Sequence, residues 1–264
     1  MITQFACMEN TRRLFIKKAG VAGMVATPFP AMASAIYPAP TVQSSTSEKG
    51  PVVLFQGDSI TDGNRTRDND WNHVMGHGYA CLAASRLWYD YPEQKLSFYN
   101  RGISGNRIGD LEKRWQQDTL DLKPDVVSIL IGVNDVLAIV NNNAPEPVTQ
   151  FADSYKRVLD KTLTALPNVT IVLCEPFILP LGWVNHRKEV WLEEIAQQQQ
   201  MVRELAASYK TLFVSLQEPF QKACEIAPAD YWIWDGVHPM PAGHELIARL
   251  WIKEVSRKLT FIRS

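Results

Sequence analysis

Five short runs of apolar residues alternate with segments of helical composition along most of this chain, and this alternation restricts its fold more than any other feature. Each run is rich in valine, isoleucine, leucine or phenylalanine and is bounded by glycine, proline or polar residues, as expected of strands buried on both faces. Such strands separated by helices predict a doubly wound, three-layer α/β sandwich with a mostly parallel sheet of roughly five strands. The predicted strands are 52–55, 96–99, 125–131, 169–174 and 212–215, and the predicted helices are 79–91, 108–122, 148–166, 188–209 and 241–259.

The first predicted strand is followed directly by the tripeptide Gly57-Asp58-Ser59. The polar, turn-forming residues after the strand place Ser59 at its carboxyl end, which is the edge where open parallel sheets bind ligands. Ser59 is therefore a candidate nucleophile. A serine in this position can also be a helix N-cap or an ordinary turn residue, so the tripeptide alone leaves both interpretations open.

Two later strands end in similar turns, one containing Gly105 and the other containing Asn134. Because the carboxyl ends of parallel strands share one edge of a sheet, these turns are expected to lie beside Ser59. The backbone amides of Ser59 and Gly105 and the side-chain amide of Asn134 could then donate to an oxyanion. The sequence thus predicts an oxyanion hole formed by these three residues.

A serine nucleophile needs a base, and the base needs an acceptor that holds its tautomer. Asp235 and His238 stand just before the last predicted helix, with two residues between them, so one loop can present both side chains in the same direction. The sequence predicts a catalytic triad of Ser59, His238 and Asp235. Other interpretations remain open: Asp235 could cap a turn, and the base could be another histidine, namely His73, His77, His186 or His244.

Four ordered segments together resemble the SGNH, or GDSL-type, hydrolase family. They are Gly-Asp-Ser at Ser59, Gly-Ile-Ser-Gly-Asn around Gly105, Gly-Val-Asn-Asp around Asn134 and Asp-Gly-Val-His ending at His238. The resemblance covers nearly all of residues 51–258 and implies a flavodoxin-like fold and serine esterase activity. Within the family, the segments are most similar to bacterial acetyl xylan esterases. That similarity implies removal of O-acetyl groups from xylan or xylo-oligosaccharides through an acetyl-serine intermediate, with no metal or cofactor.

Aromatic residues beside the Asp-His pair are candidates for substrate binding. Trp232 and Trp234 could stack on a sugar ring or belong to the core, and Asp58 is a third candidate contact, although Asp58 and Asp135 are also expected to hold their turns. Loops 62–78 and 176–187 leave the substrate open. The alternatives are a lysophospholipase or thioesterase acting on longer acyl chains, and a carbohydrate-binding protein without catalysis.

The N-terminal segment has the order of features found in an export signal. Arg12 and Arg13 resemble a twin-arginine signal, and a modestly apolar stretch and an Ala-x-Ala site follow them. We therefore expect a signal peptide over 1–35, a flexible linker over 36–49 and a single hydrolase domain over 50–264. The expected location is the periplasm or the exterior of the cell.

Composition narrows the partners. The 264 residues have a formal net charge of −1, with 21% charged and 46% hydrophobic residues, which gives no basic surface of the kind that binds nucleic acid. No Cys-x-x-Cys motif occurs, so a structural zinc site is not expected. The sequence also contains no apolar run of transmembrane length, and the expected partner is an acetylated carbohydrate. A homo-oligomer remains open.

Overall fold

The computed structural model describes residues 49–68, 70–141 and 148–262, so the predicted signal peptide and nearly all of the predicted linker lie outside the described residues. The described chain forms a sheet of five parallel strands in the order β2-β1-β3-β4-β5. The predicted doubly wound α/β sandwich is therefore confirmed. The strands are β1 (Val52–Gly57), β2 (Ser97–Asn100), β3 (Val126–Leu130), β4 (Thr170–Cys174) and β5 (Leu212–Val214).

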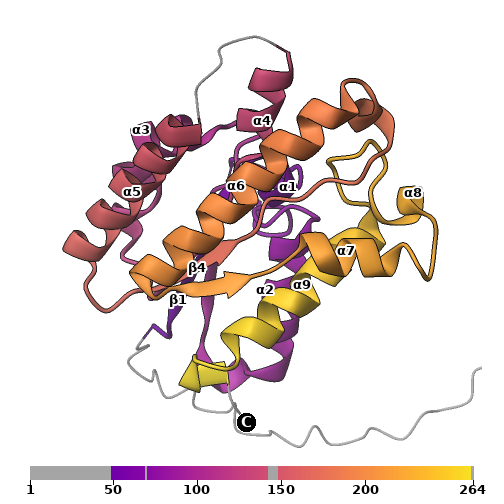
Figure 1. Ribbon diagram of the computed structural model, residues 1–264. Helices are drawn as coiled ribbons and strands as arrows, with labels where there is room; N and C mark the ends of the chain where they lie inside the picture. Colours follow the sequence, from indigo (N-terminus) through magenta and orange to yellow (C-terminus); the bar gives the residue numbers. More distant parts are fainter. Residues whose placement is uncertain (1–48, 69, 142–147, 263–264) are drawn as a thin grey trace, which may run out of the picture. The chain divides into compact units, whose positions relative to one another are not determined.

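Helices cover both faces of the sheet (Figure 1). Helices α2 and α9 pack together on one face, and α3, α5 and α6 pack against the other. The longer helices are α2 (Tyr79–Asp90), α3 (Ile108–Asp118), α4 (Val133–Val140), α5 (Val148–Ala165), α6 (Lys188–Tyr209) and α9 (Pro241–Val255). The shorter helices are α1 (Ser59–Asp62), α7 (Gln217–Ala223) and α8 (Ala229–Trp232), and single 3₁₀ turns are η1 (Pro92–Gln94), η2 (Leu120–Leu122), η3 (Gly182–Asn185) and η4 (Thr260–Ile262).

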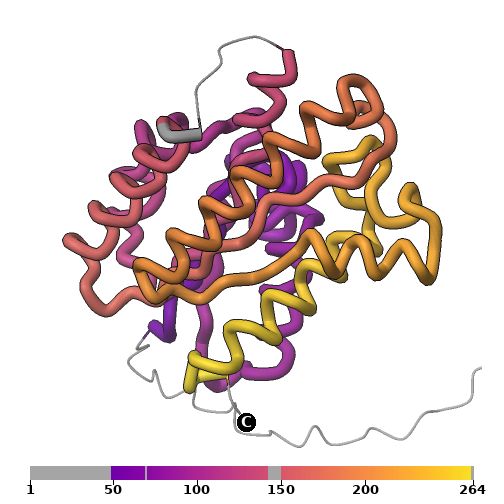
Figure 2. Tube along the Cα trace, viewed as in Figure 1, coloured from indigo at the N-terminus to yellow at the C-terminus, as the bar shows by residue number. Residues whose placement is uncertain are grey.

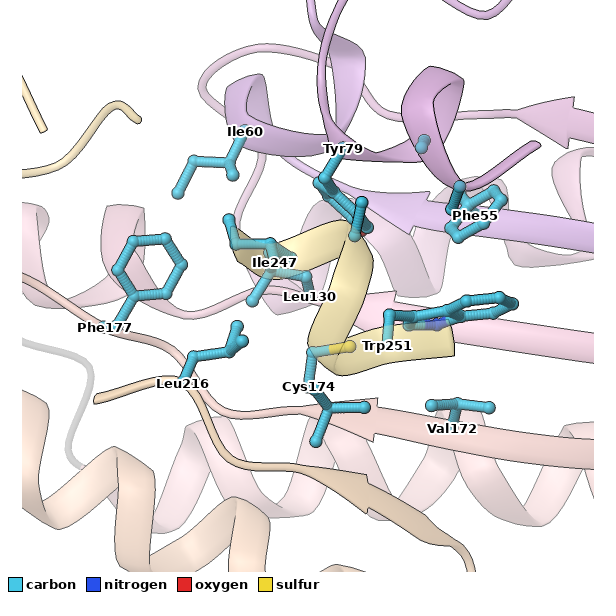
Figure 3. Close-up of a cluster of buried hydrophobic side chains, with 14 of the residues drawn as sticks. Phe55, Ile60, Tyr79, Leu130, Val172, Cys174, Phe177, Leu216, Ile247 and Trp251 are labelled. Atoms are coloured by element: carbon cyan, nitrogen blue, oxygen red, sulfur yellow. The ribbon is translucent and has the colours of Figure 1, made fainter. Parts of the chain in front are cut away.

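The apolar residues of β1 divide between the two faces because successive side chains of a strand point in opposite directions. Phe55 joins the cluster under α2 and α9, whereas Leu54 joins the cluster under α3 and α5. Figure 3 shows the first cluster, in which the ring of Phe55 lies 5.0 Å from that of Trp251 and 5.7 Å from that of Tyr79. Removing a fully buried ring of this kind typically costs about 3–5 kcal/mol, so this cluster fixes the helices that flank the carboxyl edge of β1.

The strand order creates a switch point at the carboxyl edge. The chain leaves β1 through α1 and α2 on one face and passes from β3 to β4 through α5 on the opposite face, as the trace in Figure 2 shows. In doubly wound sheets the crevice between two such strands is where ligands bind. Ser59 follows β1 and Asn134 follows β3, and the Gly105 turn follows β2 on the other side of β1.

Four α-helices are absent from the sequence prediction, namely α1, α4, α7 and α8. Helix α4 follows Gly132, whose φ of 134° is one that glycine adopts far more readily than other residues. A Cβ on Gly132 would also lie 2.5 Å from Oε1 of Gln198, which is only 1% exposed. Gln198, although it stands in the polar tract 197–200 of α6, therefore packs against the turn that begins α4 and does not face solvent.

None of the helices within the described ranges combines the length and the apolarity that spanning a bilayer requires.

Cys81, Cys174 and Cys224 are all free thiols, and Cys174 is fully buried in the cluster of Figure 3, as expected of a small apolar residue.

Candidate active site

Ser59 is held at the point where β1 becomes the short helix α1. The carboxylate of Asp58 caps this helix by accepting a hydrogen bond of 3.0 Å from the backbone N–H of Ile60. Ile60 is itself buried in the core, and its side chain is labelled in Figure 3. Gly57 before the turn has no room for a side chain, because a Cβ there would lie 2.3 Å from the carbonyl oxygen of Leu130. The strand end, the cap and the buried Ile60 together fix the position of Ser59.

The structure brings Ser59, His238 and Asp235 together in one hydrogen-bonded row. Oγ of Ser59 lies 2.8 Å from Nε2 of His238, and Nδ1 of His238 lies 2.7 Å from Oδ2 of Asp235. The other carboxylate oxygen of Asp235 accepts the backbone N–H groups of Val237 and His238 at 3.0 and 2.7 Å. Both oxygens of Asp235 are therefore occupied, and the imidazole has one preferred orientation.

Charge is distributed along this row as a general base requires. The hydrogen bond to Asp235 raises the pKa of His238 above its ordinary value, although partial burial opposes that shift. Burial tends to raise the pKa of Asp235, but the hydrogen bonds from the His238 ring and from two backbone amides outweigh it and hold the pKa below its ordinary value. Asp235 is thus an anion that stabilises a protonated His238.

The predicted oxyanion donors lie on the turns that follow β2 and β3. The side-chain amide of Asn134 donates a hydrogen bond of 3.1 Å to the carbonyl oxygen of Asn106, the residue after Gly105. A side-chain amide has two N–H groups, so this bond leaves Asn134 a second donor. Gly105 is exposed and has a φ of 82°, and nothing would obstruct a Cβ there, so the backbone conformation alone accounts for glycine at this position.

A buried polar network joins the Gly105 turn to the serine helix. The side-chain amide nitrogen of Asn100 donates to the backbone carbonyls of Thr61, Asp62 and Met75, and its oxygen accepts the N–H of Gly102. One carboxylate oxygen of Asp62 accepts the backbone N–H of Ser104 at 3.1 Å. These roles could not be predicted from the sequence, because neither Asn100 nor Asp62 belongs to a recognisable catalytic pattern.

Arg114, on α3, also holds the turn that contains Gly105 in place. The guanidinium of Arg114 donates to the side-chain oxygens of Asn106 and Gln56, both at 2.9 Å, and to the carbonyl oxygen of Arg101 at 2.8 Å. This single side chain connects the end of β1 with the turn that contains Gly105. The turn is therefore a rigid element, as a preorganised oxyanion hole requires.

Two carboxyl groups lie under the site. Burial raises the pKa of Asp58 to about 7 and that of Asp135 to about 8. Asp135 lies 3.4 Å from the backbone N–H of Ile108, at the start of α3. Asp58 is 1% exposed and caps α1, so its placement does not support the prediction that it contacts substrate.

Two exposed tryptophans lie beside the imidazole of His238 and contact each other, with ring centroids 6.3 Å apart. The ring of Trp234 lies nearly parallel to it, with centroids 6.1 Å apart, and the ring of Trp183 meets it at 90° with centroids 5.7 Å apart. Trp183 and Trp234 are 50% and 56% exposed. Trp232 is different: its indole N–H donates to the carbonyl oxygen of Ala227 and its ring packs against Tyr231, so the structure does not bring it to His238.

Trp183 was missed by the sequence analysis because it lies in an irregular segment without periodicity. It also borders a mainly apolar pocket of about 360 Å³ between α4 and the start of α6. The pocket is lined by Leu137, Val140, Asn141, Trp183, His186 and Trp191.

The remaining histidines have other positions. His244 is buried and accepts the backbone N–H of Tyr79 at 3.1 Å, which caps α2, and its burial lowers its pKa to about 4. His73 lies 2.6 Å from Asp70 on the surface, and His186 lines the pocket beside Trp183. Among the described residues, none of these is hydrogen-bonded to Ser59. No three His, Cys, Asp or Glu side chains in the described ranges cluster in a way that would hold a metal ion.

The sequence and fold match characterised proteins over most of the chain. The acetylxylan esterase of Geobacillus stearothermophilus is 33% identical over 210 residues, which make up 78% of this chain and 94% of that enzyme. Its solved structure is 31% identical, has a TM-score of 0.70 and is matched over 82% of this chain and 98% of that one. A solved protein from Parabacteroides merdae, described as a GDSL-like lipase, is 38% identical with a TM-score of 0.76, over 80% of this chain and 97% of that one.

Solved structures of the Geobacillus enzyme include catalytic mutants in which a serine, an aspartate or a histidine is replaced by alanine. The model of the GDSL-like Lipase/Acylhydrolase family matches residues 55–246, which include Ser59, Asp235 and His238. The chain therefore belongs to the GDSL-like lipase/acylhydrolase family and is a carboxylic ester hydrolase.

Proposed function

We propose that this esterase removes O-acetyl groups from a xylan-type plant polysaccharide or oligosaccharide through an acetyl-serine intermediate. The observation that carries the proposal is the row from Ser59 to His238 to Asp235, with hydrogen-bond distances of 2.8 and 2.7 Å. This geometry prepares the serine hydroxyl for deprotonation, which is the step that an acyl transfer to serine needs.

In the first half of the reaction, Oγ of Ser59 bonds to the acetyl carbonyl carbon as its proton passes to Nε2 of His238. The carbonyl electron pair moves onto oxygen, and the backbone N–H groups of Ser59 and Gly105 and the free side-chain N–H of Asn134 donate to that oxyanion. The bond between the acetyl carbon and the sugar oxygen then breaks. His238 returns its proton to the sugar oxygen, and Asp235 stabilises the imidazolium in between.

In the second half, water takes the place of the sugar hydroxyl. His238 accepts a proton from water as its oxygen attacks the acetyl group on Ser59, and the same donors stabilise the second oxyanion. Collapse breaks the bond to Oγ, which takes the proton back from His238, and the product leaves as acetic acid, which ionises to acetate in water. No group beyond those in the row and the oxyanion hole takes part in this scheme.

The exposed tryptophans support a carbohydrate on the alcohol side of the ester. Sugars present apolar C–H faces that pack on aromatic rings, and Trp183 and Trp234 expose two adjacent rings beside His238, with centroids 6.3 Å apart. The relative in Geobacillus is an acetylxylan esterase, which supports the same class of substrate.

A second candidate substrate is an ester with a longer acyl chain. The pocket of about 360 Å³ beside Trp183 has apolar walls, including Leu137 and Val140, and could accept several methylene groups. Each buried methylene would then contribute about 0.8 kcal/mol to transition-state binding. A chain-length series separates the two candidates, because rates should fall from acetate to butyrate to octanoate if acetyl is the natural acyl group. Faster hydrolysis of the octanoate would favour the longer-chain substrate.

The direct test of the proposed substrate is acetate release from a panel of acetylated polysaccharides and oligosaccharides, measured beside a chromogenic acetate ester. Faster turnover of acetylated xylan or xylo-oligosaccharide than of other acetylated glycans would support the proposal. Hydrolysis of the chromogenic ester with no release from any acetylated glycan would overturn the substrate and leave the esterase chemistry standing.

We further infer that the N-terminal segment directs export by the twin-arginine route, from Arg12 and Arg13 ahead of an apolar stretch and an Ala-x-Ala site. Replacing both arginines by lysine should leave the precursor in the cytoplasm. Normal appearance of the doubly substituted protein in the periplasm would contradict this inference.

A further inference from the structure

A second pocket lies at the carboxyl end of β2, the edge strand of the sheet. Its volume is about 400 Å³, and its walls come from the loop after α1 and from the last residues of β2. The residues that matter for its chemistry are Arg65, Thr66, Arg67, Trp71, Tyr99 and Arg101. None of them belongs to the catalytic row or the oxyanion hole.

Three arginines line this pocket, namely Arg65, Arg67 and Arg101. Arg65 is 7% exposed and donates from Nε to the carbonyl oxygen of Gly102. Arg101 places its guanidinium 5.8 Å from the centroid of the Tyr99 ring. Burial, together with the neighbouring charges of Arg67 and Arg101, lowers the pKa of Arg65. Like charges held this close repel one another, and an anion between them would relieve that repulsion.

The negative charges nearby do not neutralise all three. Arg67 donates to Asp62 at 2.6 Å, and that carboxylate also accepts Ser104. Asp68, which is exposed, lines the pocket as well, and one of its oxygens accepts the N–H of Asp70. With Asp62 engaged by Arg67 and Asp68 on the surface, the inner part of the pocket is cationic.

Two buried atoms of the pocket residues lack a hydrogen-bond partner among the described residues. They are Nε of Arg101 and Oγ1 of Thr66. A buried donor left unpaired destabilises the folded state, and native structures contain few of them. Nε of Arg101 can only donate, so the group that would complete it is an acceptor, and the charge of its neighbours favours an anionic acceptor.

An aromatic platform stands beside these cations. Trp71 is 72% exposed, and its ring packs against Trp88 with centroids 6.0 Å apart. Trp88 in turn packs against Phe98 at 5.0 Å and donates its indole N–H to the carbonyl oxygen of Leu96. Trp71 is thus supported from behind while its outer face stays available, and an exposed aromatic face can bind the C–H face of a sugar.

We propose that this pocket binds a uronic acid substituent of the oligosaccharide substrate, with its carboxylate on Arg101 and Arg65 and its ring against Trp71. The planar guanidinium matches a carboxylate in geometry and charge. Arg67 of this pocket bonds Asp62, the last residue of the short helix that begins at Ser59, so this helix connects the pocket with the nucleophile. The identity of the substituent rests on the proposed function, whereas the anion-binding chemistry does not.

The test measures binding to the full-length Ser59→Ala protein, so that no turnover is needed. Isothermal titration would compare a xylo-oligosaccharide carrying one glucuronate, the matched neutral xylo-oligosaccharide, free glucuronate and inorganic phosphate. We expect the glucuronate-bearing oligosaccharide to bind at least tenfold more tightly than the neutral one and than either free anion, with a preference that weakens as salt is added. Equal affinity for the two oligosaccharides would overturn the proposal. Equally tight binding of a free anion would overturn the assignment to a substrate substituent.

Two variants locate the preference. Arg101→Gln should reduce the affinity for the glucuronate-bearing ligand about tenfold and leave the neutral ligand unchanged. Trp71→Ala, at an exposed position where the substitution should not disturb folding, should reduce the affinity for the glucuronate-bearing ligand about threefold to tenfold. Arg257→Gln, a surface change after α9 at a side chain that is 62% exposed, is the matched control and should have no effect. A preference retained in both pocket variants would overturn the proposal.

The same variants in the wild-type background should hydrolyse a chromogenic acetate ester at the wild-type rate, which also confirms that they are folded. Absence of that hydrolysis in the wild-type protein would refute the proposed function. The titrations would still report whether the pocket binds the anion. The two ideas can therefore fail separately.

Discussion

Trp183 meets His238 at a right angle, with ring centroids 5.7 Å apart. Trp183 is 50% exposed, although tryptophan residues are usually largely buried. The indole therefore offers a surface to the substrate while limiting the movement of the catalytic imidazole.

Trp183→Ala should separate recognition of the sugar from the chemistry. Losing one aromatic face costs about 0.5–1.5 kcal/mol, which corresponds to a rise in KM of about threefold to tenfold for an acetylated xylo-oligosaccharide. A small chromogenic acetate ester, which lacks the sugar face that would stack on the indole, should show a smaller change in KM. Tyr231→Ala is the control, because this exposed ring packs on Trp232 and not on His238. Equal effects of Trp183→Ala on both substrates would show that the ring acts only on the imidazole.

Asn134→Ala should slow catalysis while leaving substrate binding almost intact. Its side-chain amide has one N–H on the carbonyl of Asn106 and one left for the oxyanion. Removal of an oxyanion donor typically lowers kcat by about 10²–10³, because that bond strengthens only as charge develops. Steady-state kinetics after circular dichroism has confirmed folding would test this, and a variant changed only in KM would remove Asn134 from the oxyanion hole.

The pH profile should report His238. The imidazole must be neutral to accept the serine proton, and its hydrogen bond to Asp235 raises its pKa. The midpoint of the acid limb of kcat/KM should therefore lie above pH 6.5. Asp235→Asn should move this limb to lower pH and reduce kcat by as much as about 10⁴, because the wrong tautomer becomes available. His73→Asn, on the surface beside Asp70, should leave the profile unchanged. An acid limb that stays in place in the Asp235→Asn variant would contradict the assignment.

Asp58→Asn should make the protein more stable at alkaline pH. Burial raises the pKa of Asp58 to about 7 from 3.8, so the folded state binds more protons than the unfolded state between these values. The stability that the neutral carboxyl contributes is complete below about pH 3.8 and is lost as the pH rises through 7. Asparagine caps a helix as well as aspartate and cannot ionise, so the variant lacks this loss, which is about 4 kcal/mol at most.

Urea unfolding at pH 5 and at pH 8 tests this, with the wild type and the variant compared at each pH so that other titrating groups cancel. The unfolding free energy of the variant relative to that of the wild type should be larger at pH 8 than at pH 5. A difference in unfolding free energy that is the same at both pH values would show that Asp58 ionises normally.

Much of this molecule could be predicted from the sequence because its signals are local. Apolar runs mark the strands, and the short spacing of Asp235 and His238 lets one loop present both. The position of Trp183 beside His238 and the pocket lined by Arg65, Arg67 and Arg101 could not be predicted. Both depend on irregular loops whose neighbours come from distant segments. The burial of Gln198 could not be predicted for the same reason: it stands in a polar tract of α6, and the close approach of Gly132 from another element buries it.

The identity of the nucleophile is the central claim, and a trapped intermediate tests it most directly. The enzyme would be mixed rapidly with a chromogenic acetate ester, quenched in acid within the first turnover, digested and analysed by mass spectrometry. The account predicts one added acetyl group on the peptide that contains Ser59, and no acetylated peptide together with a fall in kcat of several orders of magnitude in a folded Ser59→Ala variant. Acetylation at another residue, or wild-type turnover by the Ser59→Ala protein, would contradict the serine mechanism.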